Sequence, residues 1–270
     1  MWREAGGGPR MRHNLHIVGC PRSGTTLLAE MLTTCYEVDG SSEHEESLFK
    51  LEPHAEGLYV SKKPNDILWL DRVLPLDERL HVIAMVRDPR AVVCSIHAGH
   101  PGMYFCNYPV WKRAEKALRR IRGHPRVRVV AYEDLVSRPD DIQREIEQAF
   151  PFLRRKHAFS EFHLHAHSSQ KSINALGGVR AVDQARTQGW RAHLPRLKQQ
   201  IVRHPGMRAD LVHYGYEADD AWLSILDGVQ PRDFPCRYRD RGEWLKYLEQ
   251  GLRYRGKIKR YLRRRGLHPA

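Results

Sequence analysis

Residues Ile17 to Leu28 read IVGCPRSGTTLL, and this stretch decides the fold. An apolar run stops at Gly19, a second glycine follows at Gly24, and apolar residues then recur at the spacing of one helix face. This order predicts a strand, a glycine-bounded loop and a helix. In that geometry, successive backbone N–H groups surround an anionic group at the N-terminus of the helix.

The loop has the Gly-x-x-x-x-Gly spacing of a Walker A phosphate loop, but Thr25 stands where that motif has its lysine. The Walker lysine reaches the β- and γ-phosphates of a nucleoside triphosphate. Arg22 supplies a cation from inside the loop instead. We therefore expect a site for a 5′-phosphate that carries another anionic group, and not a triphosphate site.

Beyond the loop, apolar strands alternate with helical segments, which predicts a P-loop-like α/β fold with a parallel sheet flanked by helices. Strands are expected at 58–61, 81–86 and 127–131, and helices at 66–73, 89–98, 108–122, 139–150, 191–203, 219–226 and 243–264. The polar, acidic segment 37–56 is expected to be a loop. Ligands sit at the carboxyl ends of parallel strands, so Gly19, Lys62, Arg87 and Tyr132 are expected to converge.

The 270 residues are expected to form a flexible N-terminus at 1–13, a single catalytic domain at 14–230 and a basic amphipathic helical extension at 231–270. The net charge is +13, and residues 232–270 carry 13 Lys and Arg against 4 Asp and Glu. Apolar and basic residues interleave between Trp244 and Leu262. We expect this extension to pack on the domain as a solvated helix or to contact an anionic membrane or polysaccharide.

The chain has no run that reads as a signal peptide or as a membrane span, so we expect a cytoplasmic protein, peripheral to the membrane if the extension binds there. Five scattered cysteines without a Cys-x-x-Cys pair predict reduced thiols. His163, His165 and His167 alternate, as zinc ligands on one strand face would. A surface or acceptor-pocket role is preferred for them.

The run Pro21 to Leu27, PRSGTTL, resembles the 5′-phosphosulfate loop of sulfotransferases that use 3′-phosphoadenosine 5′-phosphosulfate (PAPS). Its arginine form is similar to the carbohydrate, tyrosylprotein and bacterial branches of that family. The resemblance implies that the donor's 5′ side is bound by Arg22, Ser23, Gly24, Thr25 and Thr26.

A second anchor is implied by Arg87 and Ser95, whose spacing is similar to the family segment that grips the donor's 3′-phosphate. The alternative is an arginine that caps the strand ends and a solvent-facing serine in the helix that follows. Residues 168–194, with Gly189-Trp190-Arg191, loosely resemble the family's later donor-side segment.

Sulfuryl transfer needs a base for the acceptor hydroxyl and cations for the charge on the leaving phosphate, a role that includes Arg22. Lys62 matches a Lys-x-Pro element that carries an active-site lysine in the tyrosylprotein branch; the alternative is a pair of solvated lysines. Glu43 lies 21 residues after Arg22, the spacing of the catalytic glutamate in that branch. Candidates near it in the same loop stay open as the base: His44, Glu45 and Glu46.

The resemblance implies an enzyme that moves a sulfuryl group from PAPS to a hydroxyl or amine of a glycan, lipid or peptide. No metal and no nucleic acid partner are expected. Two alternatives remain: a P-loop kinase or NTPase, and a non-catalytic binder of acidic polymers. The missing Walker lysine at Thr25, and the lack of an apolar strand that ends in an acidic Mg²⁺ ligand, count against the NTPase.

Overall fold

The computed structural model describes residues 12–51, 57–96, 99–176, 178–179, 181, 184–238 and 244–267. The side chains at 175, 185–186 and 244–249 are not described. Of the predicted flexible N-terminus at 1–13, residues 1–11 lie outside this range. Parts of the predicted extension, 239–243 and 268–270, also lie outside it.

The described strands form one parallel sheet in the order β2-β3-β1-β4-β5, as the sequence predicts. The strands are β1 (His13–Gly19), β2 (Gly40–Ser41), β3 (Leu58–Lys62), β4 (Leu80–Val86) and β5 (Val127–Ala131). β4 pairs with a strand on each side and has both faces covered, which explains its almost unbroken apolar run.

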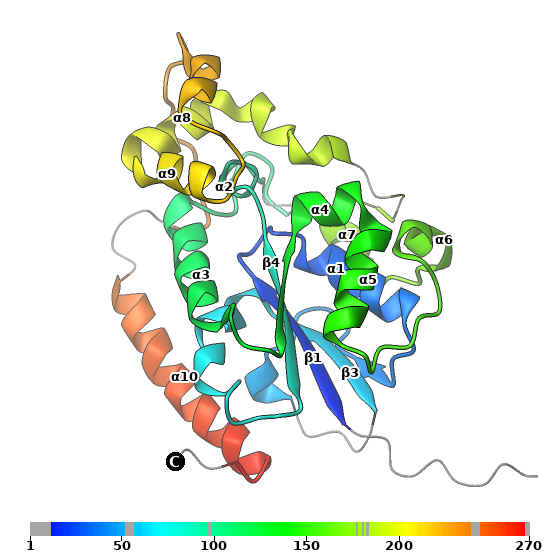
Figure 1. The fold of residues 1–270 in the computed structure, drawn as a ribbon. Helices are drawn as coiled ribbons and strands as arrows, with labels where there is room; N and C mark the ends of the chain where they lie inside the picture. Colours follow the sequence, from blue (N-terminus) through cyan, green and yellow to red (C-terminus); the bar gives the residue numbers. More distant parts are fainter. Residues whose placement is uncertain are drawn as a thin grey trace, which may run out of the picture.

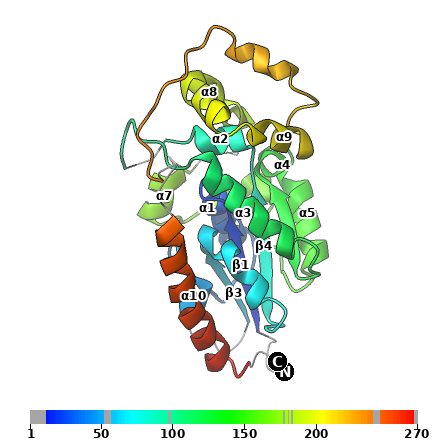
Figure 2. The ribbon, with the colours of Figure 1, turned by 90° about the vertical axis from the view of Figure 1, so that its left-hand side faces the viewer.

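Helices cover both faces of this sheet and gather beyond its carboxyl edge (Figure 1). The helices are α1 (Thr25–Cys35), α2 (Pro89–Val93), α3 (Tyr108–Ile121), α4 (Tyr132–Ser137), α5 (Pro139–Ala149), α6 (Phe162–His165), α7 (Gln170–Leu176), α8 (Leu194–Arg203), α9 (Gly206–His213) and α10 (Trp244–Arg264). α1 and α5 pack on one face, whereas α3 and α10 pack on the other. Figures 1 and 2 both show α2, α8 and α9 beyond the carboxyl ends of the strands.

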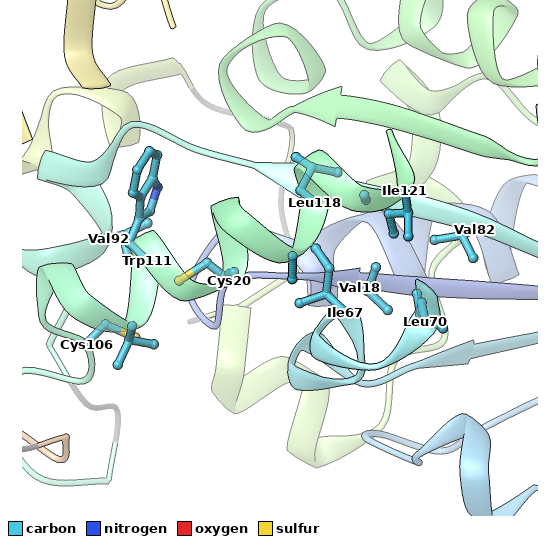
Figure 3. Close-up of a cluster of buried hydrophobic side chains, with 14 of the residues drawn as sticks. Val18, Cys20, Ile67, Leu70, Val82, Val92, Cys106, Trp111, Leu118 and Ile121 are labelled. Atoms are coloured by element: carbon cyan, nitrogen blue, oxygen red, sulfur yellow. The ribbon is translucent and has the colours of Figure 1, made fainter. Parts of the chain in front are cut away.

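Alternate residues of β1 point to the two faces, as the period of a strand requires. Leu15 and Ile17 pack with α1 and α5, whereas Val18 packs with α3. Figure 3 shows the α3 side, where Trp111 and Leu118 lie among buried side chains that come from the sheet and from the turns before β4. The two apolar layers hold the phosphate loop at the end of β1.

α10 confirms the predicted C-terminal helix and lies along the domain (Figure 2). Tyr261 is fully buried and its hydroxyl donates to Asp77. The ring of Tyr254 stacks on Trp69 at 5.0 Å between centroids. The basic side chain of Arg264 donates to the carbonyl of residue 49 at 2.9 Å. The apolar face of this helix is therefore used inside the domain.

Several predicted elements differ from the structure. The helix expected at 219–226 is a 3-10 turn at Ala221–Leu226, and the first residues of the helix expected at 191–203 belong to a 3-10 turn at Gly189–His193. The helix expected at 89–98 ends at Val93, because the backbone of Ser95 then pairs with Phe105 N–H at 2.9 Å. The helix expected at 66–73 is a pair of 3-10 turns, at Pro64–Leu68 and Leu70–Arg72. The loop expected at 37–56 contains the edge strand β2 and a further 3-10 turn.

The segments around α6, α7 and α9 carry helices that the sequence pattern did not predict. The alternation of His163 and His165 suggested a strand, but both lie on the short helix α6. His165 stacks on His157 with 3.7 Å between ring centroids. The described residues contain no group of three or more side chains placed to hold a metal ion.

Candidate active site

The glycine-bounded loop turns between β1 and α1 through three residues with positive φ, the first of which is Gly19 at 149°. Gly24 has φ 93°, and a Cβ there would lie 2.4 Å from the Tyr132 ring. Arg22 has φ 75°, which is uncommon for a residue with a side chain. Ser23 Oγ donates to Cys20 O at 2.7 Å and closes the loop. The N-cap residue of α1, Gly24, has no side chain with which to cap the helix, so the first N–H groups of α1 are available to an anion.

A cavity of about 790 Å³ opens at this helix N-terminus. The loop and the first turn of α1 form one wall, and the rest comes from the segments that follow β3, β4 and β5 and from segments further along the chain. The basic side chains that line it are Arg22, Lys63, Arg87 and Arg237. Its volume lies within the range of pockets that bind nucleotide-sized ligands, roughly 300–1,000 Å³.

Arg22, Arg87 and Ser95 meet on one side of this cavity. Arg22 Nε donates to Ser95 Oγ at 2.7 Å, and Arg87 Nη1 donates to Arg22 O at 3.0 Å. Burial lowers the pKa of Arg22, and the like charge of Arg87 lowers it further. Two guanidinium groups that line the same cavity attract an anion. Ser95 reaches this place from an extended segment and not from a helix.

Arg87 is fixed by the residues around it before any ligand binds. Its guanidinium lies 3.9 Å from the centroid of the Tyr132 ring, and its carbonyl accepts from Trp111 Nε1 at 2.9 Å. The next residue, Asp88, caps α2 by accepting from the N–H of Arg90 at 2.7 Å. The strand end, the cap and the proline at 89 therefore hold the loop in one conformation.

Lys62 is the last residue of β3 and is 2 % exposed. Its Nζ donates to Thr26 Oγ1 at 2.8 Å, which ties the end of β3 to the first turn of α1. Burial lowers the pKa of Lys62. Lys63 lines the main cavity and forms a partly exposed ion pair with Glu45, with 2.8 Å between Nζ and Oε2. Of the two neighbouring lysines, Lys62 is the one that contacts the phosphate-loop helix.

The acidic loop lies across the end of β3. The N–H of Ser42 donates to residue 60 and the N–H of Glu46 donates to Lys62, both at 3.0 Å. Glu45 lines the main cavity, whereas Glu43 lines a smaller cavity beside it.

The remaining candidates for the base in this loop are His44 and Glu46. His44 lines both cavities, and burial followed by the charge of Lys62 lowers its pKa. Glu46 lines neither cavity and interacts with Tyr59. Burial would raise the pKa of Glu45, but its ion pair with Lys63 outweighs burial and lowers it.

Several residues of the cavity wall carry no local signal in the sequence. Phe105, His193, Arg237 and Tyr238 line the cavity from segments far along the chain. Trp190 also lines it, and its segment was indicated only by a loose resemblance. These residues reach the cavity through tertiary packing. The guanidinium of Arg237, for example, lies 4.9 Å from the centroid of the Phe105 ring.

No family model matches this sequence, and no curated protein does either. The sulfotransferase domain from the Synechococcus PCC 7002 olefin synthase is similar in structure, with a TM-score of 0.50 and 18% identity. The match covers 71% of this chain and 91% of that domain. The sulfotransferase domain from the curacin biosynthetic pathway has a TM-score of 0.53 and 16% identity, covering 72% of this chain and 98% of that domain.

Both similar structures are named as sulfotransferase domains, and the match covers almost the whole of each domain. In the part of the chain that the structure describes, no helix has the length and apolar character of a membrane span. The same fold is indicated by the order of the strands, by the uncapped helix after β1 and by the match to both domains. This chain has the fold of the sulfotransferases.

Proposed function

We propose that this protein is an enzyme that transfers a sulfuryl group from PAPS to a hydroxyl or amine of an acceptor such as a glycan, lipid or peptide. One observation carries the proposal. The uncapped N-terminus of α1 and the cluster of Arg22, Arg87 and Ser95 line a single cavity. A ligand with two separate anionic groups suits this pair of sites, and the similarity in fold supports the same reaction.

The residues present fit the two anionic ends of the donor. The first turn of α1, with Thr25 and Thr26, suits the 5′-phosphosulfate, because its backbone N–H groups are uncapped. Arg87 and Ser95 suit the 3′-phosphate, because a guanidinium and a hydroxyl can bind one phosphate together. Arg22 lies between the two groups. A P-loop kinase or NTPase is disfavoured because Thr25 occupies the place of the Walker lysine.

In this proposal the bound donor supplies an electrophilic sulfuryl group on a phosphate leaving group. Lys62 is the proposed cation for the charge that develops on that phosphate, because its Nζ is held on Thr26 in the first turn of α1. Glu43 is the proposed base and accepts the proton of the acceptor hydroxyl. His44 and Glu45 lie in the same loop and are the alternatives, since both line the main cavity. No step in this scheme uses a metal.

The test measures the thermal stabilisation of the protein by nucleotides and then the transfer of sulfate from PAPS to an acceptor. Adenosine 3′,5′-bisphosphate should raise the melting temperature, because a ligand that binds only the native state stabilises it. ATP with Mg²⁺ should have little effect. Radiolabelled sulfate from PAPS should then reach an acceptor in a panel of glycans, lipids and peptides. Stabilisation by ATP with Mg²⁺ alone would instead favour the NTPase.

We further propose that α10 gives this cytoplasmic enzyme a peripheral contact with an anionic membrane or polysaccharide. Tyr254, Ile258, Tyr261 and Leu262 are buried against the domain, while Leu252 is exposed together with the basic residues Arg255, Lys259 and Arg263. The contact is therefore electrostatic, at roughly 1 kcal/mol per basic residue on a membrane. Changing these three residues to serine should abolish salt-sensitive retention on anionic vesicles or an acidic polysaccharide column and leave sulfate transfer to a small acceptor unchanged. Unchanged retention would refute the contact.

A further inference from the structure

A second cavity of about 170 Å³ lies beside the phosphate-loop helix. One wall is α1, a second is the carboxyl end of β3 with the start of the acidic loop, and a third is the segment that leads into α7. His44 lines both this cavity and the main one. Lys62 lines the second cavity and donates to Thr26, which lines the main one. The two cavities are therefore neighbours that share His44 as a wall residue, and the bond between Lys62 and Thr26 links their walls.

Most of the residues that line this second cavity are polar. Among the described residues that line it, only Ala29 and Val60 are apolar. Hydroxyl groups dominate the remainder, and the residues that carry them are Thr33, Ser41, Ser42, Ser61, Ser169 and Ser172. A wall of this kind cannot gain from burying an aliphatic or aromatic acceptor, because its polar groups would lose water without gaining hydrogen bonds.

The ionisable groups of the wall disfavour an anionic acceptor. Glu30 and Glu43 bring two carboxylates, against one lysine, Lys62, whose Nζ donates to Thr26; the histidines of the wall are His44 and His167. Both carboxylates can accept hydrogen bonds from hydroxyl groups. His44 adds a further polar atom, because its Nδ1 is buried without a hydrogen-bond partner among the described residues. A buried polar atom of this kind calls for a partner from a ligand or from water.

We infer that this second cavity is the acceptor subsite and takes a neutral polyhydroxylated group, such as one sugar ring of a glycan. The inference rests on the proposed sulfotransferase function. The reacting hydroxyl of the ring would form the new O–S bond and give its proton to Glu43. The electron pair of the broken S–O bond would leave with the donor's 5′-phosphate. Simple aliphatic alcohols, phenols and sugar acids are excluded by the wall.

The test uses the full chain with PAPS and three probes: a methyl glucoside, the matching methyl glucuronide and cyclohexanol. The neutral glucoside should be the preferred acceptor of the three. Thr33 Oγ1 donates to the carbonyl of Ala29 at 3.0 Å, so towards the ligand it is an acceptor. Thr33→Val removes this acceptor and should raise KM for the glucoside about three- to tenfold, the loss expected for one hydrogen bond. Thr34→Val, one residue further along α1 and outside the wall, is the matched control and should leave KM unchanged.

A second variant tests the charge of the wall. In Glu30→Gln, kcat/KM for the glucuronide relative to kcat/KM for the glucoside should rise on the order of tenfold. The variant removes one of the two wall carboxylates that repel the carboxylate of the glucuronide. Ligand-observed NMR should detect the glucoside bound to the wild-type chain, with a weaker signal in Thr33→Val. Equal turnover of the three probes, or no change in either variant, would overturn the subsite.

The measurements also separate this inference from the proposed function. If adenosine 3′,5′-bisphosphate stabilises the chain and phenols or cyclohexanol are the preferred acceptors, the donor site stands and the polyol subsite is wrong. If adenosine 3′,5′-bisphosphate does not bind and no probe is sulfated, the proposed function fails, and the acceptor role fails with it. In that case binding of the glucoside would mark the cavity as a sugar site only.

Discussion

Replacement of Arg87 by alanine is the sharpest test of the donor site. The guanidinium of Arg87 is already held by Arg22 O at 3.0 Å and by the Tyr132 ring at 3.9 Å. A 3′-phosphate would therefore bind to a preorganised group, with little loss of side-chain entropy. A charge-assisted hydrogen bond contributes about 1.5–3 kcal/mol. We expect Arg87→Ala to weaken adenosine 3′,5′-bisphosphate by about 2–3 kcal/mol, or roughly thirtyfold to 150-fold in Kd.

Isothermal titration with two nucleotides measures this loss. Adenosine 5′-monophosphate lacks the 3′-phosphate, so Arg87→Ala should weaken it much less than it weakens adenosine 3′,5′-bisphosphate. Arg144→Ala changes an exposed arginine of α5 and is the matched control for net charge. The melting temperature of each unliganded variant shows whether the fold survives.

Two results would refute the reasoning about Arg87. Wild-type affinity of Arg87→Ala for adenosine 3′,5′-bisphosphate would show that the second anchor lies elsewhere. An equal loss for both nucleotides would show that Arg87 acts on the 5′ side, through its contact with Arg22 O.

Three further predictions concern other residues. Burial lowers the pKa of Lys62 in the folded chain below its ordinary value of 10.5. Between the folded pKa and 10.5 the unfolded chain therefore binds more protons than the folded chain. The free energy of unfolding of the wild type should rise as the pH approaches 10.5. Lys62→Met should lose that rise, gain about 1 kcal/mol of stability at pH 7 in urea titrations, and lose sulfate transfer. Glu43→Gln should lower kcat far more than donor affinity, and full activity in Glu43→Gln with loss in Glu45→Gln would move the base to Glu45. Tyr261→Phe should cost about 1–2 kcal/mol in thermal unfolding, because Asp77 loses a buried hydrogen bond, and an unchanged melting temperature would contradict the packing of α10.

Much of the fold and part of the site could be predicted from local pattern. The apolar run before Gly19, the two glycines and the helical stripe after them are short-range features, and they define the strand, the loop and α1. Alternating strands and helices imply a parallel sheet, and parallel strands bring their carboxyl ends to one edge. That argument alone placed Lys62, Arg87 and Tyr132 near the loop, where the structure has them.

Other features depend on contacts between distant segments, which no local pattern encodes. The helix after Arg87 stops early because Ser95 pairs with Phe105, ten residues on. Spacing could not separate Glu43 from Glu45, because backbone bonds to β3 decide which side chain lines which cavity.

The sequence by itself therefore determined the phosphate loop, the parallel sheet and the edge at which the site forms. Periodicity and glycine positions are properties of neighbouring residues, and they suffice for these features. The tertiary structure alone decided that Arg237 closes the cavity, that α10 buries its apolar face, and that a second, polar cavity adjoins Lys62. Each of these depends on how segments separated by many residues pack together, and such packing is set by the whole chain.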